Sequence, residues 1–111
     1  MSDAAAKIAA RLEELWRSSR PLILERVAAV RSAGETLNCD PEDVQARNRG
    51  REAAHKLSGI LGVFGLPRGS ELAAELEHIL KPEHPLSPAD LTALQSRMAD
   101  LDAIIASKES S

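Results

Sequence analysis

The stretch DPEDVQARNRGREAAHKLSGILGVF, residues 40–64, decides the fold of this chain. It opens like a helix, because Asp40 can cap the first turn, Pro41 suits the first helical position, and the acids that follow favour the positive end of the helix dipole. Its apolar face, within about 60° of Leu57 at 100° per residue, consists of Ala53, Ala54, Leu57, Leu61 and Phe64. The stretch therefore predicts one long helix over residues 41–64 that packs this face into a core.

The composition of the whole chain is that of a small helical protein. Ala and Leu number 18 and 15, whereas Val, Ile, Thr, Phe, Trp and Tyr together number only 14. A chain so poor in β-branched and aromatic residues has little material for a sheet. Its 111 residues suit one domain over residues 1–111 and are too few for two well-cored ones. The predicted fold class is all-α.

Helix-breaking and capping residues predict the remaining helices, over residues 3–18, 21–33, 67–81 and 88–106. Pro21 disfavours helix at the residue before it, so a break is expected after Ser18. Gly34 is a suitable C-cap for the second helix, and Ser87 with Asp90 can form a capping box at the start of the last one. Helices of this length joined by short loops favour an antiparallel four-helix bundle, with the first helix as an additional N-terminal element.

Composition and motifs exclude several classes of function. Lys and Arg number 14 against 17 Asp and Glu, which gives a formal net charge of −3 and no basic footprint for nucleic acid. The apolar runs fall far short of the roughly 20 residues that span a bilayer, and no signal-peptide layout opens the chain. Cys39 is the single cysteine, and no glycine-rich phosphate-binding motif occurs. We expect a cytoplasmic monomer without a cofactor or an ATP site, which binds neither nucleic acid nor a membrane. The chain is either freestanding or a piece of a larger protein, and the initiating Met1 and the polar tail favour a freestanding chain.

The far face of the long helix carries a histidine beside bare backbone. His55 lies about 160° from Leu57, and Gly59 and Gly62 share its face. Each glycine inside a helix costs about 1 kcal/mol relative to alanine, and an exposed face offers no packing reason to accept two. Close approach of a partner is one reason that fits, since an exposed neutral imidazole can act as a nitrogen nucleophile. The alternative is an ordinary surface histidine with two chance glycines.

Residues 54–65, AHKLSGILGVFG, closely resemble the signature of histidine phosphotransfer (HPt) domains, A-H-x-L-K-G with a further glycine six residues on. The matching residues are His55, Leu57, Gly59 and Gly65. The resemblance implies that His55 accepts a phosphoryl group from the aspartyl phosphate of a response-regulator receiver domain, or from a hybrid sensor histidine kinase, and passes it to another receiver. In such a relay the receiver supplies the aspartate and a Mg²⁺ ion, and this chain acts as a carrier rather than an enzyme.

The resemblance also implies a docking surface for that partner around His55. Its expected members are Arg51, Glu52, Lys56, Ser58, Gly59 and Gly62. Gly59 is the position that lets the receiver approach. One residue departs from the family pattern, because Ser58 stands where the family commonly has a lysine. Arg51 or Lys56 can offset the phosphoryl charge in its place.

Two other functions compete with the relay. One is an HPt-like bundle that docks a receiver domain without transferring phosphate, which the absence of the lysine favours. The other is a di-metal carboxylate bundle, because the chain contains two Glu-x-x-His spacings, Glu52–His55 and Glu75–His78. Both pairs lie opposite the apolar stripes of their helices, so neither faces a bundle interior. We therefore expect no metal centre.

Overall fold

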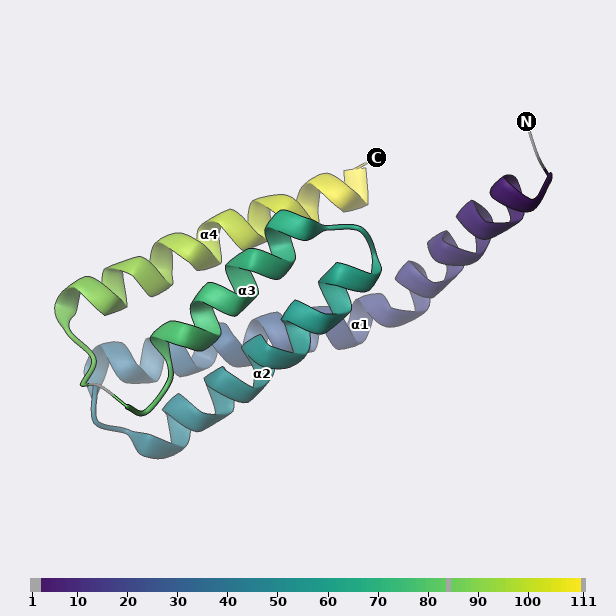
Figure 1. Cartoon of the computed structure of the whole chain (residues 1–111). Helices are drawn as coiled ribbons and strands as arrows, with labels where there is room; N and C mark the ends of the chain where they lie inside the picture. The colour runs from purple at the N-terminus through teal and green to yellow at the C-terminus, as the bar shows by residue number, and fades with distance from the viewer. Residues whose placement is uncertain (1–2, 84, 111) are drawn as a thin grey trace.

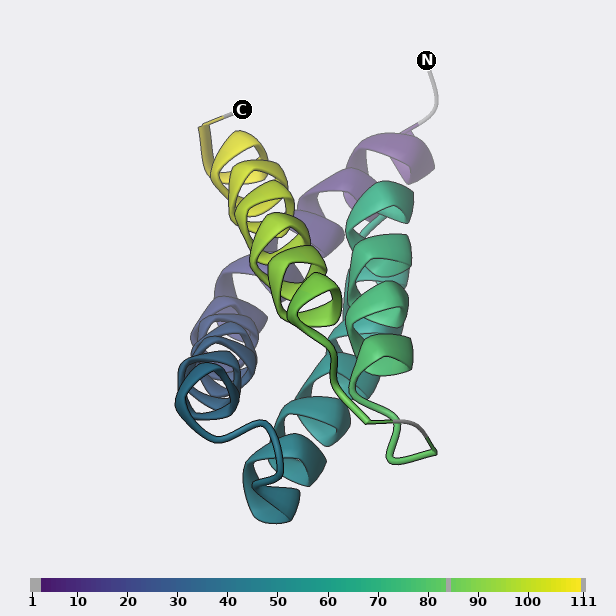
Figure 2. The same ribbon diagram turned by 90° about the vertical axis from the view of Figure 1, so that its left-hand side faces the viewer.

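The computed structural model describes residues 3–83 and 85–110. These residues form four helices and no strand: α1 (Asp3–Cys39), α2 (Val44–Val63), α3 (Pro67–Ile79) and α4 (Pro88–Ser110). Each helix runs antiparallel to the one before it, and α2 packs against both α1 and α3 (Figures 1 and 2). The predicted all-α class and the helical bundle are confirmed. No helix in the described part of the chain is long and apolar enough to cross a membrane.

The N-terminal third of the chain is one helix, so the predicted break between residues 18 and 21 is wrong. α1 continues through Pro21 to Cys39. Its buried residues recur at spacings of three, four and seven, and they are Trp16, Ile23, Val27, Val30, Ala33 and Leu37. Only an unbroken helix keeps Trp16 in line with the rest of this stripe. Packing of the stripe therefore outweighs the roughly 3 kcal/mol that proline costs inside a helix.

The first three turns of α1 project beyond the bundle (Figure 1). Residues 3–15 are all exposed, and Trp16 is the first buried residue of the helix. Its ring meets Phe64 edge to face, with 5.3 Å between the ring centroids. Trp16 is thus the packing anchor at this end of the bundle, and the additional N-terminal element is the overhang of α1 rather than a separate helix.

Gly34 does not cap a helix, in contrast to its predicted role. It lies inside α1, where a Cβ atom would stand only 2.7 Å from Cδ2 of Leu94 on α4. The glycine therefore lets α1 and α4 approach each other closely. An ion pair between Arg20 and Glu109 joins the same two helices near the C-terminus of α4. The hydrogen bond that Arg20 donates within this pair lowers the pKa of the Glu109 carboxyl.

The ends of α2 set the position of the histidine-bearing stretch. Asp43, not Asp40, caps its start, because the Asp43 carboxylate accepts a hydrogen bond of 2.9 Å from the Ala46 amide. Pro41 therefore lies in the preceding turn rather than in the helix. At the other end Gly65 has a φ of +69°, and the chain turns directly into α3. The α2–α3 connection is thus only residues 64–66.

The last helix begins as predicted. The Ser87 amide donates to Asp90 at 2.9 Å, and the Asp90 amide donates to the Ser87 hydroxyl at 3.1 Å. These reciprocal bonds form the capping box in which Asp takes the usual place of Glu.

Candidate functional site

His55 lies on the open side of α2, as the apolar spacing predicted. Ala53, Ala54, Leu57 and Leu61 are buried in the core. The His55 side chain, on the opposite side of the helix, keeps 71% of its surface exposed. The bundle therefore holds the backbone of this turn from behind and leaves the imidazole accessible.

The two glycines beyond His55 leave that face bare. A Cβ atom at Gly59 would meet nothing within 4 Å, and one at Gly62 would meet only the Ser70 hydroxyl at 3.6 Å, an ordinary contact. Packing within the fold therefore does not require glycine at either position. The helix surface next to the imidazole is open along two turns.

Glu77 of α3 holds one nitrogen of the imidazole. Its Oε2 lies 3.1 Å from Nδ1 of His55, and its side chain is only 22% exposed. A carboxylate accepts a hydrogen bond, so this contact favours the tautomer that carries the proton on Nδ1. In that tautomer Nε2 keeps its lone pair and is not bound by Glu77. The free nitrogen is therefore the nucleophilic one.

Sequence reasoning did not find this contact. The available signal was the short connection after α2. In an antiparallel hairpin that turns near Gly65, His55 and Glu77 lie at comparable distances from the turn.

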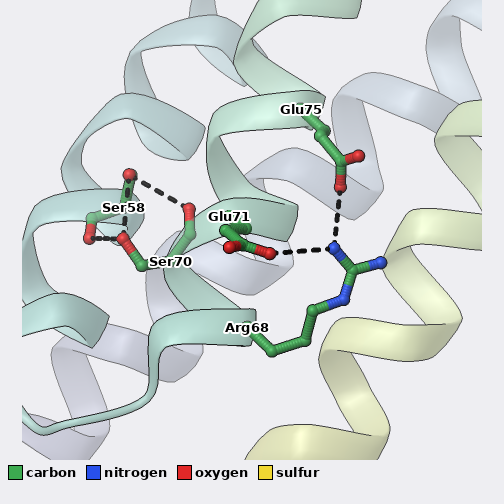
Figure 3. A network of polar contacts seen from close by, with 5 residues as sticks. All are labelled: Ser58, Arg68, Ser70, Glu71 and Glu75. Carbon is green, nitrogen blue, oxygen red and sulfur yellow. Dashed lines mark hydrogen bonds and ion pairs between the residues drawn. The ribbon is translucent and has the colours of Figure 1, made fainter.

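Ser58 lies at the seam between α2 and α3 and is half-buried there. Its hydroxyl donates to the Ser70 carbonyl at 3.1 Å, and the Ser70 hydroxyl donates to the Ser58 carbonyl at 2.8 Å (Figure 3). The two serines therefore fasten the helices to each other one turn from His55. Unlike the lysine common in the family, this side chain is committed within the fold.

The other predicted docking residues fall into two groups. Glu52 and Lys56 are exposed on α2, as are Gly59 and Gly62. Arg51 is half-buried, and its Nε is shielded from solvent without a hydrogen-bond partner. The structure therefore collects most of the predicted residues around His55, with Arg51 and Ser58 on the flank.

The residues of the rival metal site are not brought together. Glu75 pairs with Arg68 at 3.5 Å, and Arg68 also contacts Glu71 at 3.2 Å (Figure 3). His55 contacts Glu77, which belongs to neither Glu-x-x-His spacing. No group of three or more His, Cys, Asp or Glu side chains within residues 3–83 and 85–110 could hold a metal ion.

Comparison with known proteins agrees with this arrangement. The Hpt domain family model matches residues 23–104, and the chain belongs to the Hpt domain family. Protein RcaC of Microchaete diplosiphon is 32% identical over 101 residues, which cover 85% of this chain but 16% of RcaC. The chain thus spans about one sixth of the length of that relative. No solved structure gives a significant match.

Membership in this family defines the class of function. Hpt domains are carriers in two-component phosphorelays rather than kinases, and they interact with response-regulator receiver domains. The match begins at residue 23, within α1 and beyond its exposed overhang.

Proposed function

We propose that this chain is a histidine-containing phosphotransfer protein in which His55 accepts a phosphoryl group and relays it to or from the aspartate of a response-regulator receiver domain. The observation that carries the proposal is the imidazole itself. It is 71% exposed beside bare backbone, and Glu77 engages its Nδ1. Arg51, Glu52, Lys56, Ser58, Gly59 and Gly62 are the proposed surroundings of the partner.

Phosphoryl transfer to His55 requires one nucleophilic nitrogen on the imidazole ring. The lone pair on Nε2 attacks the phosphorus of the aspartyl phosphate, an N–P bond forms, and the P–O bond to the receiver's carboxylate breaks. The ring becomes a phosphorylated imidazolium that retains its proton on Nδ1. The Glu77 carboxylate, 3.1 Å away, stabilises this positive charge and fixes the ring orientation.

The reverse transfer follows the same path. A receiver carboxylate attacks phosphorus, the N–P bond breaks, and the imidazole leaves with its electron pair on Nε2. Because Glu77 holds the Nδ1 proton throughout, no proton has to be exchanged with solvent in either direction. Transfer in both directions therefore uses the same tautomer of His55, and the partners decide the net direction.

The close approach of a receiver domain accounts for the helix surface without side chains beside His55. The reacting atoms must come to about 3–3.5 Å of each other, so the receiver surface has to rest on the helix beside His55. Gly59 and Gly62 leave room on the same face of α2, one and two turns after the histidine. Ala54 and Leu57, fully buried next to His55, keep the nucleophile on a rigid element.

Cytoplasmic location and a monomeric carrier are part of the proposal. Support for the location comes from the single cysteine, Cys39, which is exposed and free, because exposed unpaired thiols persist in reducing compartments. The proposed partners are a receiver domain, a hybrid sensor histidine kinase, or both.

The test is transfer of label from a phosphorylated receiver domain. We expect acid-labile, base-stable label on the parent chain and none on His55→Gln. His78 is also exposed but lies on α3, so His78→Gln should accept label at the parental rate. Label on His55→Gln at the parental level contradicts the proposal. A receiver that binds the parent chain but never transfers label identifies the alternative, a docking module without phosphotransfer.

A further inference from the structure

The charged side chain that contacts His55 is acidic. Glu77 lies 3.1 Å from the imidazole. Glu52, three residues before His55, is exposed on the same helix. A phosphoryl group brings a further charge of about −1.5 to −2. A stable phosphorylated state therefore calls for a cation within reach of the imidazole.

The helical wheel separates the two nearest cations. Arg51 lies about 40° from His55 on one side, whereas Lys56 lies about 100° away on the other. Ser58, about 60° from His55 on the Arg51 side, contacts Ser70 of α3. Arg51 therefore shares the flank that faces α3, where Glu77 holds the imidazole. A side chain on a helix also leans toward its N-terminus, so the His55 ring leans toward the turn that contains Arg51.

Arg51 is uncommitted within the described residues. Its Nε is shielded from solvent and has no hydrogen-bond partner, so no hydrogen bond at that atom holds the guanidinium in place. The neighbouring Arg47 donates instead to the Leu80 carbonyl at 3.0 Å, and Arg68 is held by Glu71 and Glu75. Arg26 and Arg97 also have an unpaired Nε, but they belong to α1 and α4.

We propose that Arg51 is the residue that binds the phosphoryl group carried by His55. Residues four apart on a helix have their Cβ atoms about 5–6 Å from each other, and the long guanidinium side chain spans this distance. Its planar fork of donors matches two phosphoryl oxygens, and its charge is permanent. The inference rests on the proposed phosphorylation of His55 and assigns the cation of that site.

Phosphoramidate is a suitable probe, because it reports on the full chain without a protein partner. In this reaction Nε2 of His55 attacks phosphorus, the P–N bond of the donor breaks, and ammonia leaves. The initial rate is followed by ³¹P NMR. We expect Arg51→Gln to react roughly tenfold more slowly, as the loss of one charge-assisted hydrogen bond implies, and Arg51→Lys to recover part of the rate.

A control variant, a comparison variant and a salt series separate a direct role from a structural one. Arg26→Gln removes an arginine with the same unpaired Nε on α1 and should react at the parental rate. Lys56→Gln removes the cation on the other flank of His55, and we expect it to slow the reaction less than Arg51→Gln does. Added salt should slow the parent and leave Arg51→Gln nearly unchanged, because salt screens the charge that the variant lacks.

The outcomes distinguish this inference from the function on which it rests. Arg51→Gln at the parental rate, or a Lys56→Gln that is equally slow, overturns the assignment of Arg51 while His55 remains the acceptor. Parental labelling of His55→Gln under the same conditions overturns the proposed function itself.

Discussion

His55 of α2 and Glu77 of α3 meet across the seam of an antiparallel helix pair, with 3.1 Å between Nδ1 and Oε2. The carboxylate is largely covered, whereas the imidazole is largely exposed. The fold therefore holds the Glu77 carboxylate in place and leaves the His55 imidazole open to solvent. This contact assigns different roles to the two ring nitrogens.

Replacement of Glu77 tests that assignment. In Glu77→Ala the ring loses the acceptor for its Nδ1 proton, so both tautomers become populated and the imidazolium loses its counter-charge. We expect phosphorylation of His55 to slow by roughly tenfold, which corresponds to about 1.4 kcal/mol of activation free energy. The unfolding free energy should change by less than about 1 kcal/mol, because an ion pair with one exposed member contributes little to stability.

Glu77→Gln and a spectroscopic measurement complete this test. The Gln side-chain oxygen can still accept the Nδ1–H bond but carries no charge, so the variant should fall between the parent and Glu77→Ala. Nitrogen-15 shifts of the His55 ring should report a proton on Nδ1 in the parent and a mixture of tautomers in Glu77→Ala. Identical ring shifts in the two proteins would contradict the role given to Glu77.

The rotation of α2 could be read from the sequence, whereas its contacts with α3 could not. Ala53, Leu57 and Leu61 repeat at helical spacing, and burial of that stripe leaves His55 no position but the outside. Spacing within one helix carries no information on which residue of the next helix lies opposite. That register depends on the three-residue turn around Gly65 and on the Ser58–Ser70 bonds. A short turn near Gly65 places His55 and Glu77 at comparable distances from it, but only the structure shows that the two side chains meet.

In α1, by contrast, tertiary packing overrides the local sequence signals. Pro21 is a strong local signal for a break, and Gly34 is a strong one for an end, yet the helix continues through both. Trp16 lies on one side of Pro21 and Ile23 on the other, and both are buried in the same core. Tertiary packing decides in such cases, because the free energy of burying large side chains exceeds the local preference.

Leu57 and Leu61 test the rotation of α2 through stability. Both side chains are fully buried, so Leu57→Ala and Leu61→Ala should each cost roughly 2–5 kcal/mol of unfolding free energy. Val63, on the same helix but 68% exposed, provides the matched control, and Val63→Ala should change stability by less than about 0.5 kcal/mol. Urea unfolding followed by circular dichroism measures all three. Equal effects at Leu57 and Val63 would mean that α2 is rotated differently.

The overhang of α1 should be dispensable for folding. A chain that lacks residues 1–14 loses residues 3–14, which are exposed, and the 3.6 Å contact between Glu13 and Lys108. Exposed ion pairs of this kind contribute little to stability. We expect its unfolding free energy to lie within about 1 kcal/mol of the parent. Trp16→Ala, which removes the buried anchor, should cost roughly 3–5 kcal/mol instead. A truncated chain that unfolds as readily as Trp16→Ala would show that the overhang stabilises the bundle.

Substitution of Gly59 tests whether the glycine is required by the fold or by a docking partner. Because a Cβ at this position would meet nothing within 4 Å, Gly59→Ala should stabilise the helix by up to about 1 kcal/mol. Gly59→Leu should fold at least as well as the parent. A larger side chain one turn after His55 would nevertheless stand where a receiver has to rest, so transfer from a phosphorylated receiver should become much slower.

The size of the phosphodonor makes this last prediction specific. Phosphoramidate needs no docking surface, so Gly59→Leu should take phosphate from it at the parental rate while failing to take it from the receiver. Gly59→Glu should be slower with both donors, because its charge also repels the incoming phosphoryl group. Loss of reactivity toward phosphoramidate in Gly59→Leu would indicate damage to His55 itself. Parental transfer from the receiver in both variants would leave the surface at Gly59 without a role in docking, and the glycine there would be a chance residue.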